Sequence, residues 1–219
     1  ANHIKRHEGI KSIPELYKRV TKLLEIVGLT PVSDFVDKYP AFLSGGQRQR
    51  VSIARVLAMD PELIVVDEAT SMIDTSLRIS LLGTLKDIQQ EFGVSYFFIT
   101  HDLALGRYFA RDQRIMVMYL GRVVETAPTD ELIDMPLHPY TKAVLSAARG
   151  TSGILEKQVG EKYELSGADI PSFKNIPTGC PLHPRCPQRI AGLCEIVFPQ
   201  FRDMGKGHIV ACHLYKGGV

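Results

Sequence analysis

The sequence contains no apolar run of about eighteen residues, the length that a membrane-spanning helix requires. Its first residues also lack the charged and then apolar segments of a secretory signal. Neither sign of charge dominates, because 26 Lys and Arg residues stand against 24 Asp and Glu residues and the formal net charge is +2. Composition therefore gives no argument for a nucleic-acid partner or for attraction to an anionic membrane surface. We expect a globular protein of the cytoplasm.

Internal repeats and low-complexity segments are absent as well. The chain has 219 residues, 45% of them hydrophobic and 23% charged, enough for one sizeable core and an appendage. Apolar runs at residues 63–66, 94–99 and 114–120 are separated by helix-like segments that include residues 45–59 and 75–91. This alternation predicts an α/β domain with parallel strands, whose ligand binds beyond the carboxyl ends of the strands.

Residues 43–50, Leu-Ser-Gly-Gly-Gln-Arg-Gln-Arg, precede one of these helix-like runs. Small residues at a helix start present backbone N–H groups together with the positive end of the helix dipole, which favours a bound phosphate. A second interpretation is that Ser44 and Gln47 form a capping box, with which any helix can begin. It does not account for Gly45 and Gly46, because glycine costs backbone entropy in an ordinary helix. We favour phosphate binding at this stretch.

Two carboxylates, Asp67 and Glu68, follow the apolar run 63–66. The four apolar residues do not alternate with polar ones and are rich in β-branched side chains, which predicts a buried strand. Carboxylates at the end of a buried strand need a charge partner to offset their desolvation, and Mg²⁺ is one such partner. A structural interpretation is also open, in which a carboxylate only caps the next helix.

Four segments together resemble the family of ATP-binding-cassette (ABC) proteins. Residues 43–47 resemble the signature motif of the family, and residues 63–68 resemble its Walker B strand. Residues 71–74 match the position of the D-loop, and His101 matches the switch histidine, in the order that the family has. Four motifs in register are far more specific than any one of them alone.

The resemblance assigns roles to these residues. Asp67 would be associated with Mg²⁺, usually through water. Glu68 would polarise the water that attacks the γ-phosphate of ATP, and His101 would contact that phosphate. Ser44, Gly45, Gly46 and Gln47 would touch ATP, and Asp74 would face it from the D-loop.

One motif of the family is missing from this sequence. Nowhere does the chain contain Gly-x-x-x-x-Gly-Lys-Ser/Thr, the Walker A loop that holds the nucleotide phosphates. We expect the chain to be the C-terminal portion of a longer protein and not to hydrolyse ATP appreciably by itself. In the family, the signature motif of one cassette completes the ATP site of another. The resemblance therefore implies a second ABC ATPase subunit as a partner, either an identical copy or a related chain.

All 4 cysteines lie in the last stretch of the chain, at Cys180, Cys186, Cys194 and Cys212. Two disulfides are one interpretation, which a cytoplasmic setting disfavours. A zinc site is a second interpretation and a [4Fe–4S] cluster is a third. We favour a four-cysteine metal site, with the cluster ahead of zinc. Four reduced cysteines without a metal are the remaining alternative.

Residues 137–143 and 179–187, together with Cys194 and residues 211–213, resemble the C-terminal region of oligopeptide and dipeptide importers. Some members of that family carry an iron–sulfur cluster there. The resemblance implies the ATPase subunit of a peptide-type importer, peripheral on the cytoplasmic face of the membrane, with ATP and Mg²⁺ as cofactors. Its partners would be transmembrane permease subunits and, indirectly, an extracytoplasmic substrate-binding protein. The cargo could be a peptide, nickel or a sugar.

The expected fold is thus α/β, a partial ABC nucleotide-binding domain. Residues 1–60 would form the helical subdomain, ending in the signature motif and its helix. Residues 61–127 would form part of the RecA-like parallel-sheet core, with the Walker B strand, the D-loop and the switch histidine. Residues 128–219 would form a small cysteine-containing extension of the oligopeptide-transporter type. Two alternatives stay open for the function: a soluble, non-transport ABC ATPase, and a non-catalytic metal-bearing interaction module.

Overall fold

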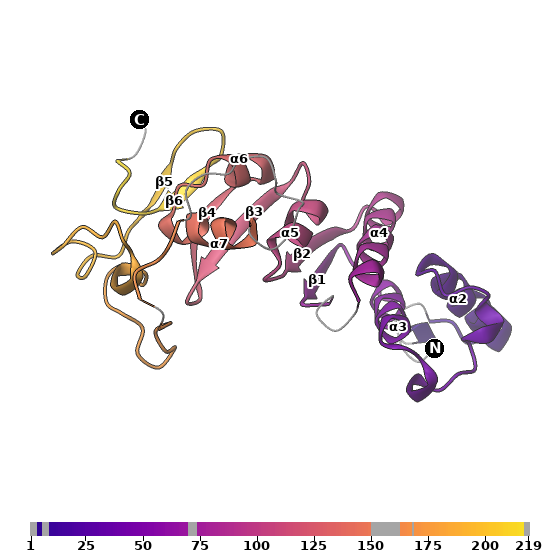
Figure 1. Ribbon diagram of the computed structural model, residues 1–219. Helices are drawn as coiled ribbons and strands as arrows, with labels where there is room; N and C mark the ends of the chain where they lie inside the picture. Colours follow the sequence, from indigo (N-terminus) through magenta and orange to yellow (C-terminus); the bar gives the residue numbers. More distant parts are fainter. Residues whose placement is uncertain (1–3, 6–8, 70–73, 150–162, 168, 217–219) are drawn as a thin grey trace. The chain divides into compact units, whose positions relative to one another are not determined.

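The computed structural model describes residues 4–5, 9–69, 74–149, 163–167 and 169–216. The chain divides into two compact units, residues 1–101 and residues 102–219 (Figure 1). The first unit contains a parallel pair of strands and the second an antiparallel sheet, so the expected α/β class is confirmed. The prediction of parallel pairing is wrong for the run 114–120, because residues 114–119 pair antiparallel with the next strand in the sheet of the second unit. Within the described ranges, no helix has the length and apolarity that crossing a membrane demands.

The first unit combines helices with the parallel pair of strands. Its helices are α2 (Ile13–Ile26), α3 (Gly45–Leu57) and α4 (Thr75–Phe92), with 3₁₀ turns at Val32–Asp34 and Pro40–Phe42, and its strands are β1 (Leu63–Asp67) and β2 (Ser95–Ile99). Helix α4 ends where Gly93 takes a φ of 67°, which glycine adopts without a steric penalty. The same helix supplies the largest part of the buried core at helical spacing, through Leu81, Leu82, Leu85 and Ile88.

Strand β1 is buried on only one face, so the prediction of a buried strand is wrong for every second residue. Ile64 and Val66 are 8% and 7% exposed, whereas Leu63 and Val65 are 57% and 60% exposed. Val65 pairs with Phe97 of β2, which is 46% exposed on the same side. Parallel sheets normally bury both faces. In the described part of the chain, this second face is apolar and uncovered.

The second unit contains a sheet with the strand order β3-β4-β6-β5. Its elements are α5 (Leu103–Phe109), β3 (Arg114–Tyr119), β4 (Arg122–Pro128), α6 (Thr129–Asp134), α7 (Pro139–Arg149), a 3₁₀ turn (His183–Arg185), β5 (Phe201–Asp203) and β6 (Ile209–Ala211). Strand β6 lies beside β4, with Glu125 paired to Val210 (Figure 1). One sheet therefore contains strands from both sides of the boundary that was predicted after residue 127. The predicted division into three segments stays a prediction.

Two apolar clusters fill the second unit. One joins β4, α6 and α7 through Ala127, Leu132, Ile133 and Leu145. The other contains Tyr119, Leu120, Val124, Cys180, Leu182 and Cys194. The second cluster places cysteines of the C-terminal segment against residues of β3 and β4, in an apolar setting.

Candidate functional site

Glu68 and His101 contact each other at the carboxyl end of the parallel strands. The register places Asp67 beside Ile99, and the backbone N–H of Glu68 donates to the Ile99 carbonyl at 3.1 Å. Glu68 Oε1 accepts a hydrogen bond from the backbone N–H of His101 at 3.2 Å and lies 2.7 Å from His101 Nδ1. Both side chains are accessible, His101 at 78% and Glu68 at 39%. Parallel pairing thus brings into contact two residues that the sequence places 33 positions apart.

The backbone of Glu68 has a φ of 49°, in the left-handed region that residues with a Cβ seldom adopt. Such conformations persist only where the surrounding structure determines them, and they gather at functional sites. Here the turn ends β1 and directs the carboxylate toward His101. The strained conformation is consistent with a functional role for Glu68.

Asp67, the last residue of β1, is exposed. The expectation that Asp67 needs a charge partner rested on burial, and this premise is wrong because Asp67 lies on the open face of β1. An exposed carboxylate still suits Mg²⁺ that keeps part of its water shell. In the described part of the chain, no group of three or more His, Cys, Asp or Glu side chains could hold a metal ion. The association of Asp67 with Mg²⁺ therefore stays a prediction.

The stretch Ser44–Gly45–Gly46–Gln47 begins helix α3, and the capping-box interpretation is confirmed. Ser44 Oγ accepts a hydrogen bond from the backbone N–H of Gln47 at 3.3 Å, and Gln47 Oε1 accepts one from the backbone N–H of Ser44 at 3.0 Å. Gly45 and Gly46 form the first turn, where N–H groups have no acceptor within the helix. Capping and phosphate binding are compatible, because the cap fixes the direction of this turn at the positive end of the helix.

Asp74 is the N-cap residue of α4, although its side chain makes no capping hydrogen bond. The first turns of α3 and α4 are neighbours, since a Cβ built on Gly46 would lie 3.8 Å from Leu77 Cδ1. The fold therefore places Asp74 at the start of the helix that packs beside the signature-like turn. The other residues of the predicted D-loop, 71–73, lie outside the described residues.

The four cysteines converge in the second unit. Burial, followed by the neighbouring thiols of Cys180, Cys186 and Cys194, raises the pKa of Cys212 to about 11. The backbone N–H of Cys180 donates to the Cys194 carbonyl at 2.8 Å. Gly179 permits this approach, because its φ is 61° and a Cβ there would lie 2.4 Å from the Cys194 carbonyl oxygen. Residues that are scattered along the last stretch of the sequence are thus brought together.

All four cysteines are free thiols, so neither disulfide of that interpretation is formed. Burial also raises the pKa of Cys180 and of Cys186, with smaller contributions from neighbouring thiols. Low-dielectric surroundings thus favour neutral thiols over thiolates. Among the residues that the structure describes, no set of ligands could hold a metal ion, so metal binding at the cysteines stays a prediction.

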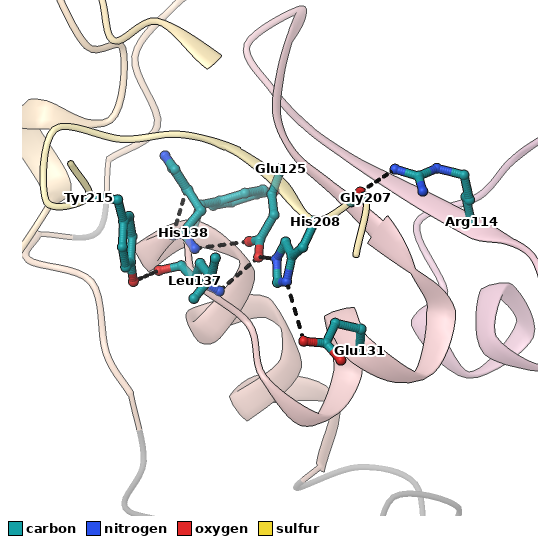
Figure 2. A network of polar contacts seen from close by, with 9 residues as sticks. Arg114, Glu125, Glu131, Leu137, His138, Gly207, His208 and Tyr215 are labelled. Carbon is teal, nitrogen blue, oxygen red and sulfur yellow. Dashed lines mark hydrogen bonds and ion pairs between the residues drawn. The ribbon is translucent and has the colours of Figure 1, made fainter. Parts of the chain in front are cut away.

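A buried carboxylate, Glu125 of β4, connects three segments of the second unit (Figure 2). Glu125 is 0% exposed. Its oxygens accept hydrogen bonds from the backbone N–H groups of Leu137 and His138 at 2.7 and 2.9 Å and lie 2.7 Å from His208 Nε2. The Tyr215 hydroxyl donates to the Leu137 carbonyl at 2.8 Å. The predicted importer motif at residues 137–143 is thereby fixed between β4 and the C-terminal segment.

This network was not predicted from the sequence. His138 belongs to the predicted importer motif, whereas Glu125 and His208 belong to none of the predicted motifs. One feature of the sequence could have indicated that Glu125 is buried, because Glu125 directly follows two valines within a strand. His138 itself is buried as a neutral ring: burial lowers its pKa to about 4, with a smaller effect of Lys142, and its Nδ1 accepts a hydrogen bond from the backbone N–H of Tyr140.

Comparison with known proteins gives two family matches and a set of close relatives. Residues 2–71 match the ABC transporter family, and residues 124–194 match the C-terminal region of oligopeptide/dipeptide transporters. The chain is 42% identical over 204 residues to the oligopeptide transport ATP-binding protein AppF of Bacillus subtilis (strain 168), covering 92% of this chain and 59% of AppF. It is 43% identical over 194 residues to the probable peptide ABC transporter ATP-binding protein y4tS of Sinorhizobium fredii, covering 89% of this chain and 52% of y4tS. The chain thus spans little more than half the length of these relatives.

Solved structures of ABC cassettes resemble part of the fold. The dimeric structure of MJ0796, a bacterial ABC transporter cassette, matches with a TM-score of 0.50 and 31% sequence identity, covering 58% of this chain and 53% of that one. A dimer of MJ0796 in a post-hydrolysis state with bound ADP and Pi matches with the same TM-score, identity and coverage.

Proposed function

Because this chain belongs to the ABC transporter family and carries an oligopeptide/dipeptide transporter C-terminal region, we propose that it is part of the ATP-hydrolysing subunit of a peptide importer. The observation that carries the proposal is the contact between Glu68 and His101 at the carboxyl ends of β1 and β2. Relatives over most of this chain are named oligopeptide transport and peptide import ATP-binding proteins. The chain spans 59% of AppF, so the proposed activity is that of a protein with the full length of these relatives.

Glu68 acts as the general base in this proposal. Its carboxylate is accessible to water and is held by the backbone N–H of His101, so it can accept a proton from a water molecule that attacks the γ-phosphate. His101 turns Nδ1 to Glu68, which leaves Nε2 to face the phosphate. Mg²⁺, when bound beside Asp67, supplies positive charge for the phosphate oxygens.

The signature turn acts on a different ATP molecule. Ser44, Gly45, Gly46 and Gln47, with Asp74 beside them, contact ATP that is held mainly by the phosphate loop of a second ABC subunit. Two features support this role: the accessible first turn of α3 and the dimeric form of the MJ0796 cassette. Formation of the dimer then depends on ATP at the shared site, and hydrolysis releases it.

Coupling to transport requires membrane partners. We place the ATPase at the cytoplasmic face of the membrane, bound to permease subunits that receive peptide from an extracytoplasmic binding protein. The named functions of the relatives support peptides as the cargo. A soluble, non-transport ABC ATPase is disfavoured by the match of residues 124–194 to an importer region.

The four cysteines are the proposed ligands of a [4Fe–4S] cluster in the C-terminal segment. Cys180, Cys186, Cys194 and Cys212 would hold such a cluster as four thiolates, and it would supply one-electron redox chemistry there. The packing of Cys180, Cys186 and Cys194 in one apolar cluster supports this proposal, and these three thiols also contribute to the raised pKa of Cys212. A single zinc ion is the alternative, and among the described residues no group of three or more His, Cys, Asp or Glu side chains could hold a metal ion.

Replacing Cys186 by Ser is expected to lower the bound metal and destabilise the C-terminal segment, while the response to nucleotide is unchanged. A serine hydroxyl is a poor substitute for a thiolate on iron. Iron, acid-labile sulfide and zinc would be measured after anaerobic purification, with Val197→Ser as a control in the same segment, where no thiol is lost. Equal metal content in Cys186→Ser and the parent protein would contradict the assignment.

The first test of nucleotide function is a calorimetric titration of this chain with Mg-ATP, with a turnover assay on the same sample. We expect very weak binding and no appreciable turnover, because the sequence has no phosphate loop. The full ATPase that contains this chain is expected to bind and hydrolyse ATP. Tight binding and turnover by this chain alone would show that the phosphates are held elsewhere in it. A metal-bearing protein that fails to respond to nucleotide even at full length would favour the non-catalytic module instead.

A further inference from the structure

Arg50 of helix α3 reaches both neighbouring helices of the first unit. Its Nη1 donates to the carbonyl of Val27, the C-cap residue of α2, and to Thr84 Oγ1 of α4 at 3.2 Å. Its Nη2 donates to Ser80 Oγ of α4 at 2.9 Å. One half-buried guanidinium group therefore connects the helix of the signature turn to the helices on either side of it.

The backbone of α2 makes room for this guanidinium. Gly28 follows the C-cap with a φ of 71°, and a Cβ at Gly28 would lie only 2.7 Å from Arg50 Nη1. Any other residue would be strained at this φ and would also push the guanidinium away. The glycine and the arginine thus form a matched pair, one supplying the space that the other fills.

Arginine is suited to this position for physical reasons. Its planar fork directs several N–H donors at fixed angles, so one side chain can bind a carbonyl and two hydroxyl groups at once. Its charge also lies at the C-terminal end of α2, where the helix dipole favours a cation. Lysine could keep the charge but not the arrangement of donors.

Two of the helices that Arg50 connects, α3 and α4, carry the segments proposed to face ATP. Helix α3 begins at the signature turn, with Ser44 as its N-cap, and α4 begins after Asp74 of the D-loop. The two first turns are neighbours, because Gly46 lies close to Leu77. Arg50 lies about one and a half helical turns into α3, and its partners Ser80 and Thr84 lie about one and a half and two and a half turns into α4.

We infer that Arg50 is a positioning residue for the signature turn: it holds α3 and α4 in one orientation, so that Ser44–Gln47 and Asp74 meet the nucleotide of the partner subunit together. This inference rests on the proposed ATPase function. It predicts an effect on the step in which two subunits close around ATP. Binding of ATP to the phosphate loop of either subunit should be unaffected.

The test uses the full ATPase that contains this chain, with ATP affinity and turnover measured separately. Arg50→Ala is expected to lower kcat roughly 10- to 100-fold, because small misplacements of a reacting geometry have effects of that size. The Kd for ATP in single subunits is expected to stay unchanged. Arg50→Lys should give an intermediate kcat. The double variant Ser80→Ala/Thr84→Ala should lower kcat in the parent but add nothing in the Arg50→Ala background.

Leu24→Ala controls for loss of stability alone. Leu24 is a buried residue of α2, and its truncation leaves a cavity without removing any Arg50 bond. If Arg50→Ala lowers kcat no more than Leu24→Ala does at the same loss of thermal stability, the positioning role is overturned. Should Arg50→Ala not fold, the Ser80→Ala/Thr84→Ala variant is compared with Leu24→Ala in its place.

Ser44→Ala separates the proposed function from the positioning role of Arg50. Unchanged turnover in Ser44→Ala refutes the role of the signature turn itself. Lowered turnover in Ser44→Ala, together with normal turnover in Arg50→Ala, refutes only the positioning role.

Discussion

Glu68→Gln in the full ATPase is expected to abolish steady-state ATP turnover and peptide uptake while leaving ATP binding intact. The amide oxygen can still accept the hydrogen bond from the His101 N–H that Glu68 accepts now, so the local fold is retained. The amide cannot take a proton from water, and loss of a general base typically lowers a rate by roughly 10²- to 10⁴-fold. Turnover would be followed by phosphate release, and binding by calorimetry with Mg-ATP.

Glu62→Gln is the matched control, because Glu62 is an exposed glutamate just before β1 and the variant removes the same charge. Its turnover is expected to match that of the parent protein. Full turnover in Glu68→Gln would exclude Glu68 as the base and would leave the contact with His101 as a structural feature of the sheet end.

Glu125→Ala is expected to destabilise the second unit by about 3–5 kcal/mol, because it removes a buried carboxylate that accepts three hydrogen bonds, and each donor left unpaired costs about 1–3 kcal/mol. The variant leaves three donors without their acceptor: the half-buried backbone N–H group of Leu137, and the buried backbone N–H group of His138 and ring of His208. Each unsatisfied donor carries its own desolvation penalty. Chemical denaturation gives the free energy of unfolding, and hydrogen exchange at the amides of residues 137 and 138 gives the local effect.

Glu131→Gln is the comparison for Glu125→Ala. Glu131 is 30% exposed and lies 3.9 Å from His208 Nδ1, and a pair of this kind contributes about 0–1 kcal/mol. Glu125→Gln is expected to fall between the two, because its amide keeps one acceptor but turns an NH₂ group toward a donor. A change below about 1 kcal/mol in Glu125→Ala would contradict the view that this network anchors the importer motif.

The sequence predicted where the local motifs lie relative to the helices and strands, and the structure has them at these positions. The hydroxyl and amide of Ser44 and Gln47 cap a helix that begins where the pattern placed it. The carboxylates follow the first apolar strand, and the histidine follows the second. Because parallel strands end at the same edge of a sheet, their order alone brings Glu68 and His101 to one place.

Burial could not be predicted in the same way. The run 63–66 looked buried on both faces, yet Leu63 and Val65 are exposed, because the sequence pattern does not say which other segments cover a sheet. Glu125 differs in the opposite sense, because it is a charged residue that is fully buried within a strand. A charged residue is buried only where donors from other elements meet it, and those donors come from residues 137, 138 and 208.

The sequence by itself determined the α/β class, the family and the identity of the residues proposed to meet ATP, since each depends on patterns within a few neighbouring residues. Only the tertiary structure decided that Cys180, Cys186 and Cys194 share one apolar cluster, that Glu125 fixes residues 137 and 138, and that Arg50 joins three helices. These features depend on contacts between residues far apart in the chain. Such contacts form when buried polar groups find their partners in packing, which no local pattern encodes.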